Sequence, residues 1–199
     1  QPRDRVPQQP VAAAPAPREP WDAIAWLQKE RGIPLEVIER NGVNAKRTSG
    51  QVADTLCFPY AARGQVVYEK LRGSGKVIWS VAGGQPCLYG VDGLKGNEAI
   101  IIVEGEIDKL SMDAAGLEGV ASVPNGAGTP MSSVLQFGGQ EALDGARKVV
   151  LATDGDEAGR LLAQNLADTV GVDKCVVVEW RGGCKDANEV LLKRGPASV

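Results

Sequence analysis

Short apolar runs alternate with amphipathic segments in the second half of the chain, from residue 97 onward. The apolar runs lie at residues 99–103, 119–123, 148–152 and 174–179. Apolar positions recur at helical spacing over residues 107–115, 131–143, 157–170 and 187–193. Continuous apolar strands that alternate with helices predict a parallel sheet covered by helices on both faces. In such sheets the ligand site lies beyond the carboxyl ends of the strands, so functional residues are expected there.

The first half of the chain has a different pattern. Helical spacing of apolar residues predicts two short helices, at residues 21–30 and 35–40. Gly32 and the pair Asn41-Gly42 are typical of helix ends. Strand-like segments punctuated by glycines follow, at residues 55–60, 65–71, 76–81 and 87–89. These segments predict a small antiparallel β region.

Residues 1–20 are not expected to fold. They contain six of the twelve prolines, several alanines and few large apolar residues, which predicts a disordered Pro/Ala-rich linker or tail. The chain is therefore expected to have three parts: this linker, a mixed α+β unit at residues 21–96 and an α/β unit at residues 97–199.

The composition limits the chemistry that is open to the chain. Its 199 residues suit one ordinary domain or two small ones that share a core. The sequence has no histidine, and its cysteines, at positions 57, 87, 175 and 184, lack the paired spacing of zinc ligands. Zinc and histidine-dependent catalysis are therefore not expected. No apolar stretch approaches the roughly 18 residues that span a membrane, so no membrane partner is expected.

The charge is distributed unevenly along the chain. Residues 1–99 hold 13 Lys and Arg against 10 Asp and Glu, and residues 100–199 hold 9 against 15, for a net charge of −3. A basic half followed by an acidic half suits an enzyme that binds phosphates in one part and metal ions in the other. Ordinary surface variation accounts for the same asymmetry equally well.

Acidic residues follow three of the predicted strands. Glu104 comes directly after the first strand, and Asp108 falls in the first turn of the next helix. Asp154 and Asp156 follow the third strand, and Asp186 follows the fourth. Since the carboxyl ends of parallel strands meet at one edge of the sheet, we expect these five carboxylates to share that edge.

Two interpretations of these acids are open. An Asp or Glu in a first helical turn commonly caps the helix and complements its dipole, which would explain Asp108, Glu157 or Asp186 taken singly. Carboxylates gathered at one edge repel each other unless cations neutralise them. Hard oxygen ligands suit Mg²⁺, and the joint pattern EGxxD, DxD and KDANE therefore favours a metal site over coincidence.

The same motifs give the chain a family resemblance. Residues 99–193 resemble the TOPRIM domain of bacterial-type primases, topoisomerases and certain nucleases. The segments IIIVEGEIDKLSMDAAGL, VASVPNGAG, VVLATDGDEAGR and KDANEVL look like the primase part of phage-type primase–helicases and of the organellar Twinkle family, particularly its plant-like members. The upstream segments DTLCFPYAARGQVVYEKLRG and CLYGVDGL resemble the RNA-polymerase subdomain that precedes TOPRIM in those proteins. The resemblance implies a Rossmann-like parallel TOPRIM sheet flanked by helices, preceded by a small α+β primase subdomain with antiparallel strands.

The resemblance also implies roles for the acids. Glu104 would be a metal ligand or the general base that activates the attacking 3′-hydroxyl. Asp154 and Asp156 would be the metal-binding DxD pair, and Asp108 and Asp186 would complete the acidic catalytic site. The metal would be Mg²⁺ or Mn²⁺.

Basic residues would hold the nucleotide. Lys70, in YEKLR, matches a family lysine that meets nucleotide phosphate, with Arg72 as a helper and Lys185 as a further phosphate ligand. Lys70 and Arg72 could instead be ordinary exposed strand residues.

The expected activity is that of a DNA primase, a nucleotidyltransferase that makes short RNA primers on a single-stranded DNA template from ribonucleoside triphosphates. Phosphoryl transfer needs metals to align the nucleophile and cations to hold the triphosphate, which agrees with these residues. One alternative is a TOPRIM nuclease, because the acidic site alone would serve hydrolysis. Another is a non-catalytic nucleic-acid-binding module or a structural subunit of an organellar nucleoprotein assembly.

The family context sets expectations about partners and location. The zinc-binding and helicase domains of phage-type primase–helicases are not found in the sequence, which puts template preference and unaided initiation in doubt. A helicase domain of a longer chain, or other replication proteins, would be partners. The resemblance implies a mitochondrion or plastid, or otherwise the cytoplasm of a bacterium or a phage-infected cell.

Overall fold

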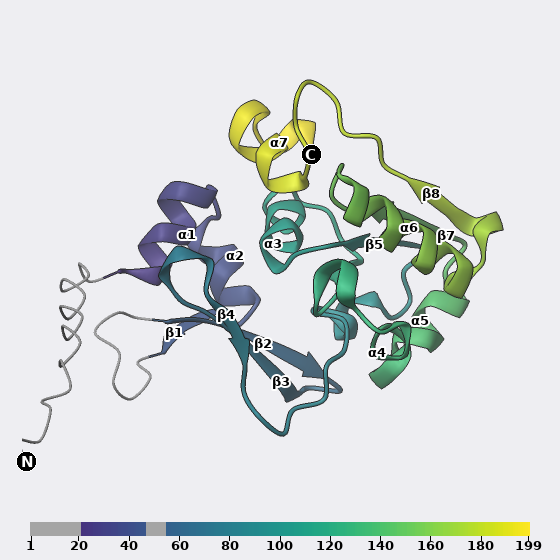
Figure 1. The fold of residues 1–199 in the computed structure, drawn as a ribbon, viewed down its shortest axis with the longest axis horizontal. Helices are drawn as coiled ribbons and strands as arrows, with labels where there is room; N and C mark the ends of the chain where they lie inside the picture. Colours follow the sequence, from purple (N-terminus) through teal and green to yellow (C-terminus); the bar gives the residue numbers. More distant parts are fainter. Residues whose placement is uncertain (1–20, 47–54) are drawn as a thin grey trace, which may run out of the picture.

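Two four-stranded sheets organise the protein, one antiparallel and one parallel (Figure 1). The structure is a computed structural model that describes residues 21–46 and 55–199, so the linker expected at residues 1–20 lies outside the described residues. The antiparallel sheet has the order β1-β2-β3-β4, and the parallel sheet has the order β6-β5-β7-β8.

Two short helices begin the described chain, close to where the sequence predicts them. Helix α1 spans Ala23–Arg31 and α2 spans Leu35–Arg40. The Asp22 carboxylate caps α1 by accepting from the Ala25 N–H at 2.9 Å, and Gly32 ends it in the left-handed region at φ 67°. Both helices bury an apolar side against the antiparallel sheet and the rest of the core.

The antiparallel sheet consists of β1 (Asn44–Lys46), β2 (Thr55–Ala62), β3 (Gln65–Arg72) and β4 (Ile78–Ser80). The sequence predicts three of these strands and misses β1, which is too short to show a period. Residues 87–89 form no strand. Tyr89 makes only an isolated bridge to Ser122, which places it beside the edge of the other sheet.

The parallel sheet has the fold class that the alternating pattern predicts. Its strands are β5 (Ala99–Val103), β6 (Val120–Ser122), β7 (Lys148–Ala152) and β8 (Cys175–Val177). Strand β5 pairs in parallel with both β6 and β7, and β8 extends the sheet beyond β7. Strands β6 and β8 are shorter than the apolar runs that predict them.

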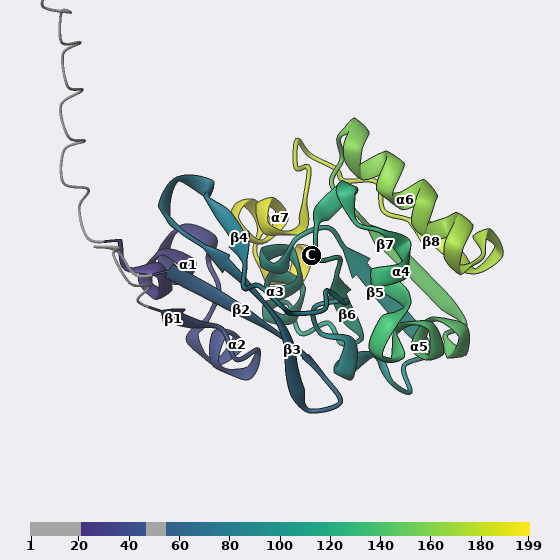
Figure 2. The same cartoon turned by 60° about the horizontal axis from the view of Figure 1, so that its bottom comes forward.

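Helices cover both faces of the parallel sheet (Figure 2). Helices α3 (Glu106–Ala114) and α7 (Ala187–Arg194) pack on one face, where Val103 meets Met112 and Ala187. The other face is covered by α4 (Met131–Leu135), α5 (Gly139–Gly145) and α6 (Glu157–Val170). Short 3₁₀ turns lie at Ser74–Lys76, Val91–Leu94, Gly126–Gly128, Gln136–Gly138, Val172–Lys174 and Pro196–Ser198.

The single helix predicted over residues 131–143 is wrong. Phe137 takes φ 53° and Gly138 φ 97°, so the chain turns between α4 and α5. An apolar period persists across this break because both short helices pack on the same core, which is why the pattern alone indicates one helix.

One apolar core joins the two sheets. A single cluster of buried side chains includes Phe58 and Tyr60 from the antiparallel sheet, Tyr89 from the connection, and Ile100 and Leu110 from the parallel sheet and its helix. Tyr60 packs edge-on to Tyr68 at a centroid distance of 5.0 Å and lies at the same distance from Tyr89. The sheets are therefore held by shared packing. Among the described residues, no helix is long and apolar enough to cross a membrane.

Candidate active site

The predicted acids do gather at the carboxyl edge of the parallel sheet. Glu104 leaves the end of β5, and Asp154 leaves the end of β7. The Asp154 N–H points to Glu104 Oε2 at 3.4 Å, and the Gly155 N–H donates to the Lys185 carbonyl at 2.7 Å. These two contacts bring the loops after β5, β7 and β8 together at the carboxyl edge of the sheet, next to Asp186; we call this edge the rim.

Two of the acids also cap helices. Asp156 precedes α6 and accepts from the Gly159 N–H at 2.9 Å, and Asp186 precedes α7 and accepts from the Glu189 N–H at 2.7 Å. Each bond uses one carboxylate oxygen, so the other oxygen of each is not part of the cap. The capping interpretation and the metal interpretation are therefore compatible for these two residues.

Asp108 has a different role in the fold. It lies in the first turn of α3, where Gly105 occupies the capping position, and its Oδ1 accepts from the Asn188 N–H at 3.1 Å. This bond ties the start of α3 to the start of α7, so Asp108 lies near Asp186 and is only partly exposed.

Burial and neighbouring carboxylates raise the pKa of two carboxyl groups at the rim. Burial, followed by the nearby Asp186 carboxylate, raises the pKa of Asp108 to about 8, although the Asn188 N–H partly opposes this. Burial, followed by Glu104 and Asp186, raises the pKa of Asp154 to about 6. A bound cation would relieve both effects, because it favours the charged form of each carboxylate.

Lys70 faces this rim from β3 of the other sheet. Its Nζ donates to Glu106 Oε1 at 2.7 Å and to the Pro124 carbonyl at 2.8 Å, and its side chain is only 13% exposed. Glu106 also accepts from the Tyr60 hydroxyl. Lys70 is thus not an ordinary exposed strand residue, and its ammonium group reaches across to the first turn of α3.

Arg72 lies two residues further along the same strand and is also not a free surface residue. Its guanidinium lies 5.0 Å from the centre of the Trp26 ring. Burial, followed by repulsion from Arg31, lowers the pKa of Arg72. The alternation of β3 places Lys70 and Arg72 on one face of the sheet, toward the acids.

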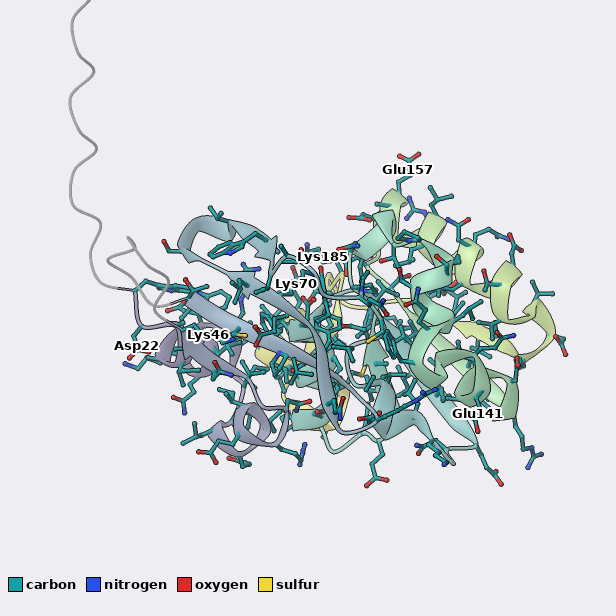
Figure 3. The ribbon with its side chains drawn as sticks, turned by 90° about the horizontal axis from the view of Figure 1, so that it is seen from below. Asp22, Lys46, Lys70, Glu141, Glu157 and Lys185 are labelled. Atoms are coloured by element: carbon teal, nitrogen blue, oxygen red, sulfur yellow. The ribbon has the colours of Figure 1, made fainter. Side chains whose placement is uncertain are left out.

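A cleft of about 740 Å³ lies between two walls, one with the acids at the rim of the parallel sheet and the other with Lys70 and Arg72 of β3. Figure 3 shows Lys70 and Lys185 close together at the centre of the molecule, whereas Lys46 and Glu141 lie toward opposite ends. Lys185 is on the acidic side, with its Nζ 3.8 Å from Asp186 Oδ2. The charged side chains that line the cleft are Arg31, Lys70, Arg72, Glu104, Glu106, Asp108, Lys185, Asp186 and Glu189.

The DxD pair is less closely associated with this cleft than the other acids. Asp154 and Asp156 do not line the cleft. Asp154 nevertheless contacts Glu104, which does line it. Within residues 21–46 and 55–199, no three His, Cys, Asp or Glu side chains are grouped closely enough to form a ready metal site. Mg²⁺ is commonly held by only one or two carboxylates, with water and substrate phosphates completing its shell.

Three residues of the site were missed by sequence reasoning. Glu106 lies in the quoted motif EGEID, but its burial against Tyr60 and Lys70 depends on a contact between the two sheets. Asn188 lies in KDANE, and its amide donates to the Arg31 carbonyl at 2.8 Å and accepts from Arg31 Nη1 at 3.2 Å. Arg31 itself gives no sequence signal, because only the packing of α1 beside α7 brings it to the cleft.

The four cysteines lie free in the structure, and three of them are buried. Burial raises the pKa of Cys57 and Cys87 to about 11, so both are protonated thiols at neutral pH. Cys57 and Cys87 are thus buried thiols that pack in the interior of the described part of the chain.

Comparison with known proteins agrees with this arrangement. Residues 101–191 match the family model described as Toprim-like. The chain is 36% identical over 192 residues to the primase homologue protein of Arabidopsis thaliana and 35% identical over 183 residues to its chloroplastic/mitochondrial Twinkle homologue. These alignments cover 88% and 83% of this chain, but only 56% and 26% of the relatives. The chain thus spans about half of one relative and a quarter of the other.

Solved structures show the same fold. A primase domain of bacteriophage T7, in a complex of lagging-strand DNA polymerase with primase domains bound to an RNA/DNA hybrid, matches with a TM-score of 0.74 and 26% identity over 85% of each chain. The primase fragment of the T7 primase–helicase matches with a TM-score of 0.71 and 24% identity, covering 94% of this chain and 79% of that one. The predicted fold class, a parallel TOPRIM sheet preceded by a small antiparallel primase unit, is confirmed. Residues 101–191 thus match the Toprim-like family model, and the resemblance of the chain to the primase part of phage-type primase–helicases and plant Twinkle proteins is confirmed.

Proposed function

We propose that this chain is the catalytic core of a DNA primase, which joins ribonucleotides on a single-stranded DNA template. The observation that supports the proposal most strongly is the cleft with carboxylates on one wall and Lys70 and Arg72 on the other. Nucleotidyl transfer requires both parts, because the nucleophile must be activated while the charge of the triphosphate is offset. The primase names of the curated relative and of the solved structures agree with it.

The proposed acidic site consists of the five rim carboxylates. Glu104, Asp154 and Asp156 would hold Mg²⁺ or Mn²⁺, and the fit rests on their oxygen donors and on the crowding that raises the pKa of Asp154. When bound, the metal supplies positive charge that offsets the phosphates and orients them. Glu104 accepts the proton of the attacking hydroxyl, and Asp186 keeps the rim negative. Asp108 adds a further negative charge when a bound cation lowers its pKa.

The proposed phosphate contacts come from Lys70, Arg72 and Lys185. Lys70 uses two of its three N–H groups on Glu106 and Pro124, which leaves one to donate to a phosphate oxygen. Arg72 is held by packing on Trp26, so its guanidinium is already oriented before nucleotide binds. Lys185 is more exposed and would contact the triphosphate from the acidic side.

We further propose the setting in which this core acts. The template and ribonucleoside triphosphates are its substrates, and a helicase domain of a longer chain or other replication proteins are its partners. The printed name of the Twinkle relative supports a chloroplast or mitochondrion as its location. Residues 21–96 would be the primase subdomain and residues 97–199 the TOPRIM domain.

A primer-synthesis assay tests the proposal. Purified protein receives single-stranded DNA, labelled ribonucleotides and Mg²⁺ or Mn²⁺, and the products are separated by size. We expect short labelled RNA from the wild type and none from the variant Asp154→Asn/Asp156→Asn. The matched control Asp144→Asn/Asp168→Asn removes the same charge from exposed helix positions and should retain synthesis.

Other outcomes identify the alternatives. A wild type that binds single-stranded DNA but makes no RNA would overturn the proposal in favour of a non-catalytic binding module. Metal-dependent shortening of the DNA, lost in the double variant, would instead indicate a nuclease, because a carboxylate metal site can also activate water.

A further inference from the structure

A second, smaller pocket lies beside the catalytic cleft, at the end of the molecule where α1 and β4 lie close together in Figures 1 and 2. Its volume is about 190 Å³, and it shares Arg31 and Arg72 with the cleft. The rest of its lining comes from Trp21 and Trp26 and from the β3–β4 turn at residues 73–75. None of the rim carboxylates borders it.

The aromatic residues of this pocket form an ordered pair. The rings of Trp21 and Trp26 lie 5.5 Å apart between centroids, at an interplanar angle of 61°. Both side chains are partly exposed, and both pack against the core, so they are fixed without being covered. Partly exposed indoles on a rigid base are the usual platform on which nucleic-acid bases stack.

The two arginines of the pocket have no acidic partner within ion-pair distance among the described residues. Arg31 and Arg72 lie 4.9 and 5.0 Å from the centre of the Trp26 ring, and neither makes an ion pair with any acid in the described part of the chain. Arg31 Nε is buried and has no hydrogen-bond partner among the described residues. Two partly buried guanidinium groups that repel each other are stabilised by an anion placed between them.

We propose that this pocket binds one nucleotide of the single-stranded template, with its base against Trp21 and its phosphate at Arg31. Arg72 borders both the pocket and the cleft, so it lies between this phosphate and the triphosphate. The inference rests on the primase function proposed above and extends it to a template subsite. The pocket is smaller than the roughly 300–1,000 Å³ of typical small-molecule sites, so it suits one ring system rather than a whole nucleoside triphosphate. Its place beyond the arginines, away from the acids, suits the template rather than the incoming nucleotide.

Binding measurements separate stacking from charge. Fluorescence anisotropy compares a labelled oligothymidylate with an abasic oligomer of equal length, which has the same phosphates but no bases. We expect the wild type to bind the first more tightly by about 5- to 100-fold. Trp21→Leu, which keeps an apolar side chain but loses the aromatic face, should reduce this ratio to near one, and Trp21→Phe should keep most of it.

A second variant tests the phosphate contact. Arg31→Gln should weaken the binding of both oligomers and lower the slope of log affinity against log salt by about 0.7. The control Arg147→Gln removes an exposed arginine paired with Glu98, away from the pocket, and should leave both quantities unchanged.

Three results would overturn the proposal: equal wild-type affinity for both oligomers, an unchanged ratio in Trp21→Leu, or a loss of ribonucleotide binding in Trp21→Leu with the ratio retained. The last would place the base of the incoming nucleotide in the pocket. These readouts need no catalysis. A protein that makes no primers but keeps the base-dependent ratio would therefore contradict the primase proposal and leave this subsite standing.

Discussion

Replacing Asp108 with asparagine removes an ionisable carboxyl from the crowded rim and keeps the oxygen that accepts from the Asn188 N–H. Burial and Asp186 raise the pKa of Asp108 to about 8, from an ordinary value of 3.8. A carboxyl whose pKa is raised in the folded protein contributes stability below its unfolded pKa and loses that contribution as the pH rises through the folded value. The metal-free protein should therefore lose stability from Asp108 between about pH 4 and pH 8.

The size of this effect follows from the shift. From pH 5 to pH 8 the contribution of Asp108 falls by at most about 4 kcal/mol, at roughly 1.36 kcal/mol for each pH unit. Because the side chain borders an open cleft where water screens its charge, we expect about half of that, roughly 2 kcal/mol. Asp108→Asn should lack this loss, so its melting temperature relative to the wild type should rise by roughly 4–8 °C between pH 5 and pH 8.

Thermal unfolding followed by circular dichroism in EDTA measures this difference. Using the difference between variant and wild type cancels the titration of the other groups, and Asp144→Asn, at an exposed position of α5, controls for the loss of one surface charge. If the melting temperature of Asp108→Asn minus that of the wild type stays constant with pH, or falls as the pH rises, the reasoning is refuted.

Three further perturbations test other parts of the site. Mg²⁺ should raise the melting temperature of the wild type at pH 8 but not that of Asp154→Asn/Asp156→Asn, and equal gains would argue against metal binding at this pair. Lys70→Met should abolish primer synthesis and lower the free energy of unfolding by about 2–3 kcal/mol, because Glu106 loses its cation. Adding Glu106→Gln should restore stability in urea unfolding but not synthesis, and restored synthesis would contradict the role given to Lys70. Asn188→Ala should destabilise the protein by about 1–3 kcal/mol in the same assay, because three buried or partly buried contacts are lost, and an unchanged midpoint would show that they do not hold α1 and α3 to α7.

Much of the fold could be predicted because its signals are local. The apolar runs at β5 and β7 have the bounds that the sequence predicts, and α6 begins and ends where its period does. The break between α4 and α5 could not be predicted, since Phe137 adopts a positive φ that its side chain does not favour and that only the surrounding packing imposes. At this position tertiary packing overrides the local backbone preference of the residue.

The candidate site also has one part that could be predicted from the sequence and another that could not. Acids at the ends of parallel strands could be predicted from one rule of topology, and the structure brings Glu104 and Asp154 into contact. The contact of Lys70 with Glu106 joins residues 36 positions apart, and that of Arg31 with Asn188 joins residues 157 apart. Their spacing in the sequence shows no pattern, because they depend on how one sheet lies against the other.

The shared core has a consequence for where the protein can be divided. The Tyr89 backbone exchanges two hydrogen bonds with Ser122, at 2.9 and 3.1 Å, and so covers the free edge of β6, while its ring packs against Tyr60. Residues 101–191 are the part that matches the Toprim-like family, but isolated from what precedes them they would expose an unpaired strand edge and the apolar surface around Leu110. The segment that matches the family model is therefore smaller than the segment that can fold. A recombinant fragment, or a gene fusion that transplants this domain, must begin at or before α1 to yield a soluble product.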